Sequence, residues 1–591
     1  MARPGNNFQK PKDFKKAIKN VVIYGKRFFP LIVFSIVLAV GSSILSVIGP
    51  NKLGDLSNVI RDTMFTGVDL IKVGNIAIAL VVIYAISALL HAIQGVIMAN
   101  ITQRYTRNLR TDISKKLNKL PFSYIDSVPY GNIMSRTAND VDTIGHGLNS
   151  SVSTLIGSGT LLIASIVMMF VTNWIMAFTA ITASLLGFSV MAIIIKKSQK
   201  YFKEQQKTLG ELNGHIEEVF SAHDIIKVYN ATASKKKQFD NLNTKLYNSA
   251  WKAQYLSGMM PIIMGFVGNF AYVAVCIVGA ILVSSGYIQF GVIVSFIVYA
   301  RLFSNPLNQI AQSISSLQST AAASERVFEL LEQKEIVSDD DVKKINISKI
   351  KGNVEFRNVK FGYTKEKTII KDFSAEVKQG QKVAIVGPTG AGKTTLVNLL
   401  MRFYEVDDGE IKIDGKDIKK ISRADLHNIF GMVLQDTWLF EGTVRENLIY
   451  NKKNISDKKL KEICDICGLT HFINTLPKGL DTILDDNTAV SLGQKQLLTI
   501  ARAMVQNSKM LILDEATSSI DTRTEVLIQQ AMDKLTQNRT SFVIAHRLST
   551  IKNADLILVM KDGDIVEQGS HKELLKQNGF YASLYNSQFE D

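Results

Sequence analysis

The fold of the C-terminal half is decided by one stretch, Lys382-Val383-Ala384-Ile385-Val386-Gly387-Pro388-Thr389-Gly390-Ala391-Gly392-Lys393-Thr394-Thr395. An apolar run expected to be a buried strand comes first, then the pattern GxxxxGK[ST], then a helical sequence. The glycines let the backbone bend so that its N–H groups and the helix N-terminus face phosphate groups. In such a loop Lys393 reaches the β and γ phosphates and Thr394 holds Mg²⁺. The stretch therefore predicts a nucleotide phosphate site.

Two further short apolar runs end in groups suited to phosphate chemistry. Met510–Leu513 is followed by Asp514 and Glu515, and Ser541–Ile544 is followed after one residue by His546. An acid at a strand end can hold the magnesium shell, the next acid can polarise the attacking water, and His546 is placed to meet the γ phosphate. Alternation of such runs with helical segments predicts an α/β domain whose parallel sheet is covered by helices.

The composition shows that this domain is only part of the chain. The 591 residues carry a net charge of +15, 46 % are hydrophobic, and the mean hydropathy is +0.12. At ~150 residues per domain, this length corresponds to about four domain-sized units. A soluble protein with this much charge has a mean hydropathy below zero, so we expect long apolar segments beside an ordinary charged domain. Three cysteines exclude a disulfide scaffold.

The apolar residues cluster in four stretches: Phe29–Ile48, Val73–Met98, Ser151–Ile195 and Leu256–Phe303. A helix needs ~20 apolar residues to cross a bilayer. The last two stretches are too long for one span and are interrupted at residues 172–174 and 284–286, so each is expected to be a helical hairpin. The sequence therefore predicts six membrane spans. Buried helices of a soluble bundle are a poorer explanation, because such helices are shorter and carry a polar face.

Lysine and arginine mark one side of the membrane. Eight precede the first span, seven lie between spans two and three, and eleven lie between spans four and five, whereas the opposite connections hold three, none and none. The basic side is expected to be cytoplasmic, with both termini inside. Much of the positive charge is thus explained by membrane topology and by attraction to anionic lipid, and not by binding of nucleic acid. The first span lacks the pattern of a cleaved signal, and no organelle targeting segment is present, which favours a bacterial plasma membrane.

The inner connections are long and have helical spacing. From Ile101 to Leu120 and from Lys196 to Lys252 the membrane helices are expected to continue into the cytoplasm and to turn near Pro121–Gly131 and His215–His223. These turns are natural contact points for a cytoplasmic domain. The expected boundaries are an N-terminal segment 1–28, a transmembrane domain 29–320, a linker 321–350 and a nucleotide-binding domain 351–591.

Taken together, these residues resemble the ABC transporters, specifically the exporter type with six spans fused to one nucleotide-binding domain. Phe361-Gly362-Tyr363 is similar to the loop whose tyrosine stacks on adenine, and Gln435 to the glutamine that touches Mg²⁺ and senses the membrane domain. Ser518-Ser519-Ile520-Asp521 resembles the D-loop, and His546 the switch histidine. The resemblance implies that ATP and Mg²⁺ are bound, with Thr394, Gln435 and Asp514 near the metal, and that ATP is hydrolysed with Glu515, His546 and Gln435 in catalytic roles.

In this family two such domains enclose two ATP molecules, each between one phosphate loop and the partner's LSGGQ signature. Here the signature reads Val490-Ser491-Leu492-Gly493-Gln494, so Leu492 replaces a glycine and is expected to crowd the γ phosphate. The preceding stretch, Thr482–Thr488, also departs from the usual exporter sequence. An intact phosphate loop beside a weakened signature resembles one half of a heterodimeric exporter, which we favour; a homodimer that tolerates Leu492 is the alternative.

The near absence of charged residues from the spans favours hydrophobic or amphipathic substrates over charged peptides or metal ions. No peptidase domain precedes the first span, which argues against an exporter that processes peptide cargo. We therefore expect a multidrug-type exporter working outward by alternating access, with a second half-transporter and membrane lipid as partners. A lipid flippase of the same architecture, or an ATP-gated membrane switch, is the alternative.

Three other features of the sequence are better explained by packing than by a binding or catalytic role. Cys464 and Cys467 have CxxC spacing, yet no second pair exists, so core packing is favoured over zinc. Cys276 is expected to fill space within the membrane. His91, inside span two, either titrates in a pore or is a polar residue facing the bundle.

Overall fold

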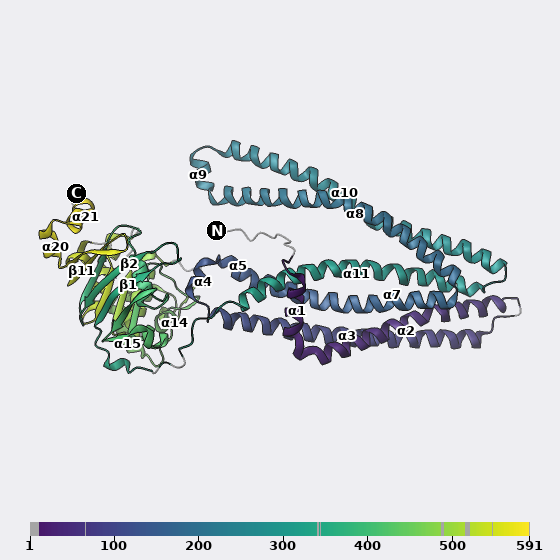
Figure 1. The fold of residues 1–591 in the computed structure, drawn as a ribbon, viewed down its shortest axis with the longest axis horizontal. Helices are drawn as coiled ribbons and strands as arrows, with labels where there is room; N and C mark the ends of the chain where they lie inside the picture. Colours follow the sequence, from purple (N-terminus) through teal and green to yellow (C-terminus); the bar gives the residue numbers. More distant parts are fainter. Residues whose placement is uncertain are drawn as a thin grey trace. The chain divides into compact units, whose positions relative to one another are not determined.

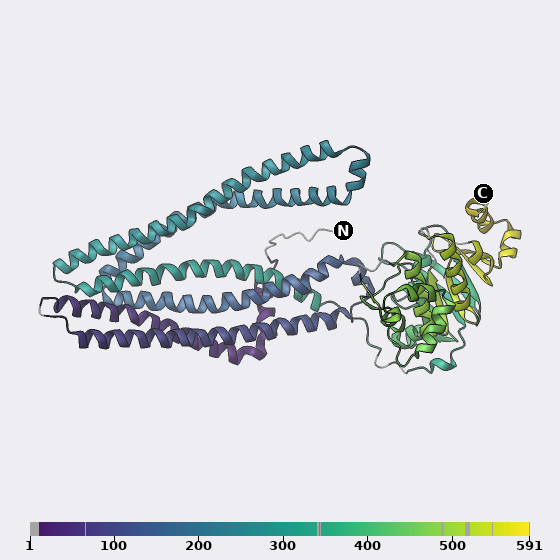
Figure 2. The same cartoon turned by 180° about the vertical axis from the view of Figure 1, so that it is seen from behind.

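The computed structural model describes residues 11–65, 67–339, 342, 344–485, 490–514, 520–545 and 548–589. The chain divides into two compact units, drawn from opposite sides in Figures 1 and 2. The helical unit comprises Met1–Lys119 and Val128–Lys334. The α/β unit comprises Leu120–Ser127 and Glu335–Asp591.

Long helices make up the helical unit. Their bounds are α1 (Phe14–Tyr24), α2 (Phe29–Asp62), α3 (Leu70–Leu117), α7 (Ser153–Thr172), α8 (Trp174–Ser221), α10 (Thr232–Ser284) and α11 (Phe290–Leu331). Shorter segments are η1 (Gly25–Phe28), α5 (Tyr130–Ser135), η2 (Arg136–Asp140), α6 (Val141–Gly147), η3 (Leu148–Val152) and α9 (His223–Val228). Within the described residues, six helical segments are long and apolar enough to cross a membrane. The prediction of six spans is confirmed, and helices suit it because they satisfy their own backbone hydrogen bonds in lipid.

Both predicted hairpin breaks are present. α7 ends at Thr172, and Asn173 has an extended backbone with φ of −165°. The Asn173 side chain accepts a hydrogen bond of 3.0 Å from the Met176 N–H and so caps α8, a strong start signal for a helix. The second break separates α10 from α11 at residues 285–289.

One predicted turn is misplaced. The turn expected at His215–His223 lies further along, at α9, because α8 continues through His215 to Ser221. His215 is buried, and its Nε2 lies 3.1 Å from the carbonyl oxygen of Lys235 on α10. This contact joins the two helices instead of reversing the chain. Before α10 begins, Asn230 takes a positive φ of 53°, which asparagine tolerates better than most residues.

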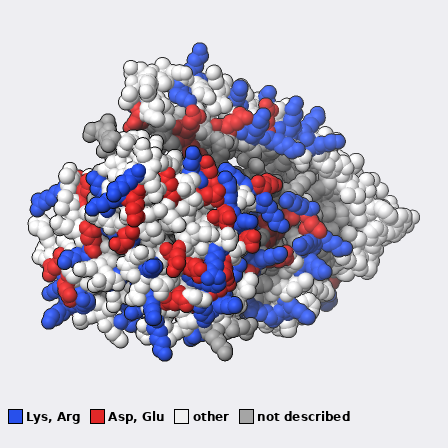
Figure 3. Space-filling model, turned by 60° about the vertical axis from the view of Figure 1, so that its left-hand side comes forward, with Lys and Arg blue, Asp and Glu red and all other residues white. Residues whose placement is uncertain are grey.

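α8 and α10 run side by side and diverge from α7 and α11 towards α9 (Figures 1 and 2). We call α8, α9 and α10 together the α8–α10 arm. Figure 3 shows Lys and Arg side chains gathered along its upper edge, and Lys236 and Lys237 are among the exposed ones. Trp251 and Tyr255 stack on its surface at 5.6 Å and remain 54 % and 56 % exposed. The arm thus presents both charge and aromatic surface.

The core of the spans lies where α2, α7, α8, α10 and α11 meet. Met169, Met176 and Phe296 are fully buried there. The Tyr299 hydroxyl donates to the Val47 carbonyl oxygen at 3.1 Å. A buried tyrosine needs such a partner, so this bond fixes α11 against α2.

The centre of the α/β unit is a six-stranded sheet in the order β12-β11-β3-β10-β9-β6. Its strands are β3 (Lys382–Val386), β6 (Phe430–Val433), β9 (Met510–Asp514), β10 (Thr540–Ile544), β11 (Leu556–Lys561) and β12 (Asp564–Gly569). All pairings except that of β11 with β12 are parallel. The three predicted strands are therefore neighbours in one parallel sheet, as expected.

A second, antiparallel sheet is a feature that the sequence analysis missed. It has the order β2-β1-β4-β5, with β1 (Val354–Phe361), β2 (Ile370–Val377), β4 (Asp408–Ile413) and β5 (Lys416–Asp417). Alternate side chains are buried along β1 and β2, the pattern of a half-buried strand. Phe356 and Phe373 pack with Phe542 of β10, so this sheet covers one face of the parallel sheet that helices were expected to cover.

Helices complete the α/β unit. Their bounds are α4 (Phe122–Ser127), α12 (Lys393–Leu400), α13 (Arg423–Ile429), α14 (Val444–Ile449), α15 (Asp457–Ile466), α16 (Thr470–Thr475), α17 (Leu492–Gln506), α18 (Thr522–Thr536), α19 (Leu548–Lys552), α20 (His571–Gln577) and α21 (Phe580–Phe589). Minor elements are η4 (Ile347–Lys349), η5 (Ile418–Lys420), η6 (Gly479–Asp481), β7 (Gly442–Thr443) and β8 (Ile483–Leu484). Cys464 and Cys467 are buried in the core between α15 and α17. Burial raises the pKa of the Cys464 thiol to about 11 and that of Cys467 to about 12, so both behave as packing residues.

An ion pair with a buried carboxylate and a half-exposed arginine gives a stability test in the helical unit. Asp140 of η2 is 3 % exposed and accepts two hydrogen bonds from Arg326 of α11, at 2.8 and 2.5 Å. We expect Arg326→Met to lower the free energy of unfolding by about 1–3 kcal/mol, because it leaves a buried carboxylate without its partner. The measurement is thermal unfolding of the detergent-solubilised chain.

The double variant Arg326→Met/Asp140→Leu removes the uncompensated charge as well and should recover most of the loss. Lys207→Met breaks the exposed pair with Glu211 and should change stability by less than about 1 kcal/mol. A double variant no more stable than Arg326→Met would contradict the explanation.

Candidate nucleotide-binding site

The loop between β3 and α12 has a backbone that only glycine allows. Gly390 and Gly392 have φ of 86° and 101°, in the left-handed region. A Cβ atom on Gly387 would lie 2.2 Å from the carbonyl oxygen of Met560 on the neighbouring strand. The glycines of the pattern are thus explained by geometry, and Pro388, Thr389 and Gly390 are exposed at the tip of the loop.

Lys393 closes this loop. Its Nζ donates to the carbonyl oxygens of Gly387 at 2.7 Å and Pro388 at 3.0 Å. Burial lowers the pKa of the Lys393 ammonium, and the nearby Asp514 carboxylate opposes that shift. Gly392 precedes α12 without a side-chain cap, so the first N–H groups of the helix point into the loop. Such an end favours an anion.

The predicted metal-binding and catalytic groups follow the strands. Asp514 ends β9, opposite Ile544 at the end of β10, and β10 lies between β9 and β3. The carboxyl ends of these strands therefore share an edge with the phosphate loop. Thr394 is exposed at the start of α12, and Gln435 is exposed just after β6. Glu515, Ser518, Ser519 and His546 lie outside the described residues.

The predicted adenine-stacking residue is positioned by hydrogen bonding and ring contacts. The Tyr363 hydroxyl lies 3.2 Å from Thr395 Oγ1 on α12, and the side chain is 47 % exposed. The ring meets Tyr404 edge to face at 5.0 Å and Phe361 at 5.1 Å. Tyr363 is thus held beside the phosphate loop while part of its ring stays open for stacking.

Comparison with known proteins agrees with this geometry. A family model described as "ABC transporter transmembrane region" matches residues 32–307, and one described as "ABC transporter" matches residues 370–518. A "Fatty acid ABC transporter ATP-binding/permease protein" of Mycobacterium tuberculosis is 41 % identical over 91 % of this chain and 85 % of its own length. The chain belongs to the ABC transporter family.

Two more distant relatives have other named substrates. An "ATP-dependent lipid A-core flippase" of Syntrophus aciditrophicus is 33 % identical over 87 % of this chain and 86 % of its own length. A "Probable multidrug resistance ABC transporter ATP-binding/permease protein YheH" of Bacillus subtilis is 32 % identical over 82 % of this chain and 72 % of its own length. This chain is accordingly a multi-pass membrane protein of the ABC exporter type, a family that binds and hydrolyses ATP and works as dimers.

The ABC signature residues have a structural role in this chain. Ser491 caps α17: its hydroxyl accepts from the Gln494 N–H at 3.2 Å, and the Gln494 side chain accepts from the Ser491 N–H at 2.9 Å. This reciprocal capping box is a strong helix start. Leu492, the residue that replaces the family's glycine, is 49 % exposed. About half of its side-chain surface is therefore open to solvent in this chain.

Gly493 is the position where a glycine is required locally. A Cβ atom there would lie 2.4 Å from Thr524 Cγ2 on α18. Asp521 caps α18 by accepting from the Thr524 N–H at 2.9 Å, and this bond lowers the pKa of the Asp521 carboxyl. The helix that begins at the signature, α17, thus packs closely on α18, the helix that the D-loop aspartate caps. Of the stretch Thr482–Thr488, β8 pairs with β7, and residues 486–488 lie outside the described part.

Sequence analysis missed one contact residue, Tyr404. Besides meeting Tyr363, it donates its hydroxyl to Asp126 of α4, and Phe122 of α4 stacks on Phe403 at 4.5 Å. Burial and the Asp126 carboxylate raise the pKa of Tyr404. The prediction that the first inner turn contacts the C-terminal domain is confirmed. The aromatic pair after α12 is the sequence signal that marks this contact.

The contact of Gly493 gives a prediction. We expect Gly493→Ala to lower the free energy of unfolding of the nucleotide-binding domain by about 1–3 kcal/mol, because the added methyl overpacks α17 against α18. Leu492→Ala, one residue earlier on the exposed side, should leave thermal unfolding unchanged. Differential scanning fluorimetry of the full chain measures both, and equal midpoints for the two variants would refute the packing argument.

Proposed function

We propose that this chain is one half of an ATP-driven exporter that moves hydrophobic or amphipathic compounds outward across the plasma membrane by alternating access. The observation that carries the proposal is the presence, in one chain, of six apolar helices and a phosphate loop closed by Lys393. The apolar windows of these helices hold at most two charged residues each. A path for metal ions or highly charged peptides needs more. Relatives named for fatty acids, lipid A core and multidrug resistance support the same class.

In this proposal ATP lies with its adenine on Tyr363 and its phosphates on the loop from Gly387 to Thr395. Thr394, Asp514 and Gln435 would hold Mg²⁺, which neutralises phosphate charge when bound. Their oxygen-bearing side chains suit that ion, and Thr394 and Gln435 are exposed at this edge of the sheet. Glu515 polarises the attacking water, His546 contacts the γ phosphate, and Gln435 senses the membrane domain.

The basic segments are proposed to be cytoplasmic, with both termini inside. The exposed lysines of the α8–α10 arm support this orientation, because positive charge favours the cytoplasmic side. The nucleotide site is then in the compartment that holds ATP. The boundaries 1–28, 29–320, 321–350 and 351–591 remain our proposal for the domains.

α4 is proposed to pass the closure of the nucleotide site to the membrane helices. Tyr404 touches Tyr363 on one side and Asp126 of α4 on the other, so a shift of the adenine-stacking residue is transmitted through a single side chain. α4 belongs to the α/β unit and follows α3 closely in the chain, so in this proposal the movement reaches the membrane helices through the chain itself.

We expect Tyr404→Phe to keep the ring contact with Tyr363 and to lose the bond to Asp126. A hydrogen bond to a charged group is worth about 1.5–3 kcal/mol, so transport per ATP hydrolysed should fall several-fold while ATP hydrolysis stays within about twofold. Both rates are measured in proteoliposomes. Tyr287→Phe changes an exposed tyrosine between α10 and α11 and is the matched control. Unchanged transport per ATP in Tyr404→Phe would remove this link.

The partner is proposed to be a different half-transporter. Leu492 is exposed at the start of α17. In this proposal its side chain weakens binding of the ATP that lies on a partner's phosphate loop. This chain would then supply Glu515 to the competent site and Ser491 to the weakened one. A homodimer that accommodates Leu492 is the second possibility.

The first test is the oligomeric mass and ATPase activity of this chain purified alone from membranes. We expect a folded chain that is monomeric or inactive and that gains activity with a partner carrying LSGGQ. A dimer whose activity is lost in Glu515→Gln would instead show that Leu492 is tolerated, and would overturn the heterodimer. Leu492→Gly is the matched variant: it should raise ATPase activity of the chain alone only if Leu492 is what limits a homodimer.

Two other functions share this architecture. A lipid flippase is supported by the lipid A-core relative, and lipid-stimulated ATPase activity without drug stimulation would favour it. An ATP-gated switch would keep conducting or signalling in Glu515→Gln, whereas a pump loses steady-state transport. The closed phosphate loop and the polarising acid in the sequence favour the pump.

A further inference from the structure

The linker that follows α11 is fastened to the α/β unit by a group of charged residues. The Asp339 carboxylate accepts from the backbone N–H of Arg423 at 2.8 Å and from its guanidinium at 2.9 Å, and it lies 3.5 Å from Arg402 Nη1. The two arginines also share Glu405 Oε1, at 2.8 Å from Arg402 and 2.7 Å from Arg423. We call Asp339, Arg402, Glu405 and Arg423 the linker clamp. The Asp339 carboxylate and both guanidinium groups are mostly buried, so water and salt screen their attraction only in part.

Arg402 has a backbone conformation that is costly for a residue with a long side chain. It lies just after α12 with φ of 55°, in the left-handed region, where helices usually have glycine or asparagine. The Phe403 N–H donates to the Asn398 carbonyl oxygen at 2.9 Å and closes the turn. Arg402 is buried, and its guanidinium also donates to the Ile421 carbonyl oxygen at 2.9 Å. A strained residue of this kind persists only where its surroundings hold it, and the contacts of the linker clamp do so here.

The turn that Arg402 starts contacts the nucleotide site and α4. Phe403 stacks on a ring of α4, and Tyr404 meets Tyr363, the predicted adenine-stacking residue, edge to face at 5.0 Å. At its other end α12 begins with Lys393 of the phosphate loop. A helix of 8 residues is a rigid element about 12 Å long. One short helix and one turn therefore connect the linker clamp to the phosphate loop and to Tyr363.

We propose that Arg402 is a positioning residue for ATP binding, through which the linker joins the last membrane helix to the nucleotide site. α11 ends at Leu331, so a movement of this helix reaches Asp339 through a short piece of chain. The linker clamp passes the movement to the turn after α12, and so to the ring of Tyr363. This route starts from the C-terminal end of the membrane helices and is separate from the route through α4. The inference rests on the proposed function, since it couples that exporter's membrane helices to its ATP.

Coupling through the linker clamp acts in both directions. If the position of α11 changes the affinity for ATP, then ATP binding changes the position of α11 by the same free energy. A variant that breaks the clamp therefore has a measurable effect on ATP binding itself, even before transport is examined.

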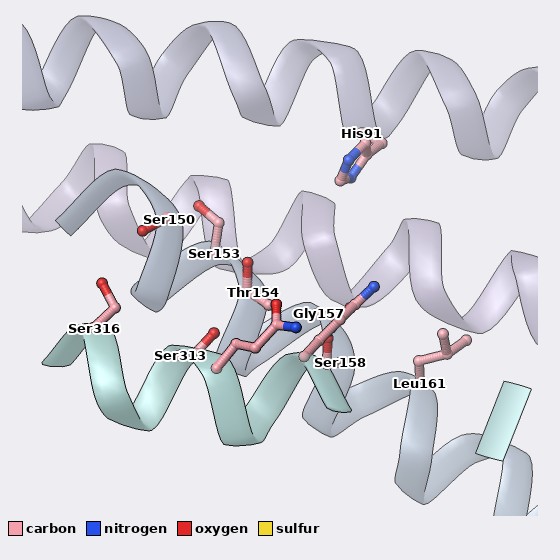
Figure 4. Close-up of a pocket in the computed structure, with 11 residues that line it drawn as sticks. His91, Ser150, Ser153, Thr154, Gly157, Ser158, Leu161, Ser313 and Ser316 are labelled. Carbon is pink, nitrogen blue, oxygen red and sulfur yellow. The ribbon is translucent and has the colours of Figure 1, made fainter. Parts of the chain in front are cut away.

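The linker clamp is separate from the cavity of the helical unit. That cavity, of about 570 Å³, lies between α3, α7 and α11, and Figure 4 shows His91 of α3 facing side chains of α7 and α11 across it. The residues that line it belong to the helical unit, whereas the four residues of the clamp belong to the α/β unit. A change of ATP binding in a clamp variant therefore does not arise from an altered cavity lining.

The test measures binding of TNP-ATP, a fluorescent ATP analogue, to the purified full-length chain. Arg402→Met and Asp339→Asn should each weaken binding about three- to tenfold, a part of what one base–aromatic stack contributes, because the adenine-stacking ring loses some of its support. The double variant should bind no more weakly than Arg402→Met, because both changes break the same route. Arg445→Met removes an arginine that joins Asp457 and Asp481 in the same unit and should bind TNP-ATP as the unaltered chain does. Equal binding by Arg402→Met and Arg445→Met, or additive losses in the double variant, would overturn the proposal.

A second variant leaves every residue of the linker clamp in place, so it separates coupling from folding. A flexible Gly-Ser segment inserted between Lys334 and Glu335, at the boundary of the two units, lets α11 move without moving the clamp. TNP-ATP binding should weaken by a similar factor, while the midpoint of thermal unfolding stays unchanged. A clamp with a purely structural role would not respond to the insertion, so unchanged binding would refute the route through the linker.

The same insertion distinguishes this inference from the proposed function. If it weakens TNP-ATP binding but the unaltered chain and its partner move no ethidium with ATP in proteoliposomes, the coupling through the clamp stands and the exporter proposal fails. If ethidium is transported and the insertion has no effect on binding, the exporter stands and the coupling through the clamp fails.

Discussion

Five strands of the α/β unit run parallel, so their carboxyl ends lie along one edge, and the chemistry of the protein depends on that constraint. β3 delivers the phosphate loop to this edge, and β9 delivers Asp514 two strands away. The phosphate loop and Asp514 therefore lie at the same edge of the sheet without a long connecting segment. Burial lowers the pKa of Lys393, and the Asp514 carboxylate opposes that shift.

The sequence alone predicted the elements whose patterns are local. The strands beginning at Lys382 and Met510 were read correctly because a buried parallel strand is a continuous apolar run, and the break at Asn173 because a polar cap inside an apolar stretch ends one span. The antiparallel sheet was missed because its strands alternate buried and exposed residues, so they contain no continuous apolar run. The turn near α9 was misplaced because His215, although polar, is buried against α10.

In the nucleotide site too, local patterns were predicted from the sequence and long-range contacts were not. The spacing of the phosphate loop is sufficient to predict Lys393 and Thr394, since a backbone bend needs its glycines at fixed positions. The role of Tyr404 could not be read from spacing, because its two partners, Tyr363 and Asp126, lie far before it in the chain. The sequence shows that Leu492 departs from the family signature, and the structure shows where its side chain lies. Within its own chain it is an exposed first residue of a helix that Ser491 and Gln494 cap without it.

The α8–α10 arm has a consequence for how the protein is made. Its two long helices pair with each other, then leave the rest of their own bundle, and a ring stack at Trp251 and Tyr255 stays uncovered. A newly inserted chain on its own would expose this aromatic surface of the arm to chaperones and proteases. Stability of the subunit in the cell would then depend on dimerisation soon after synthesis.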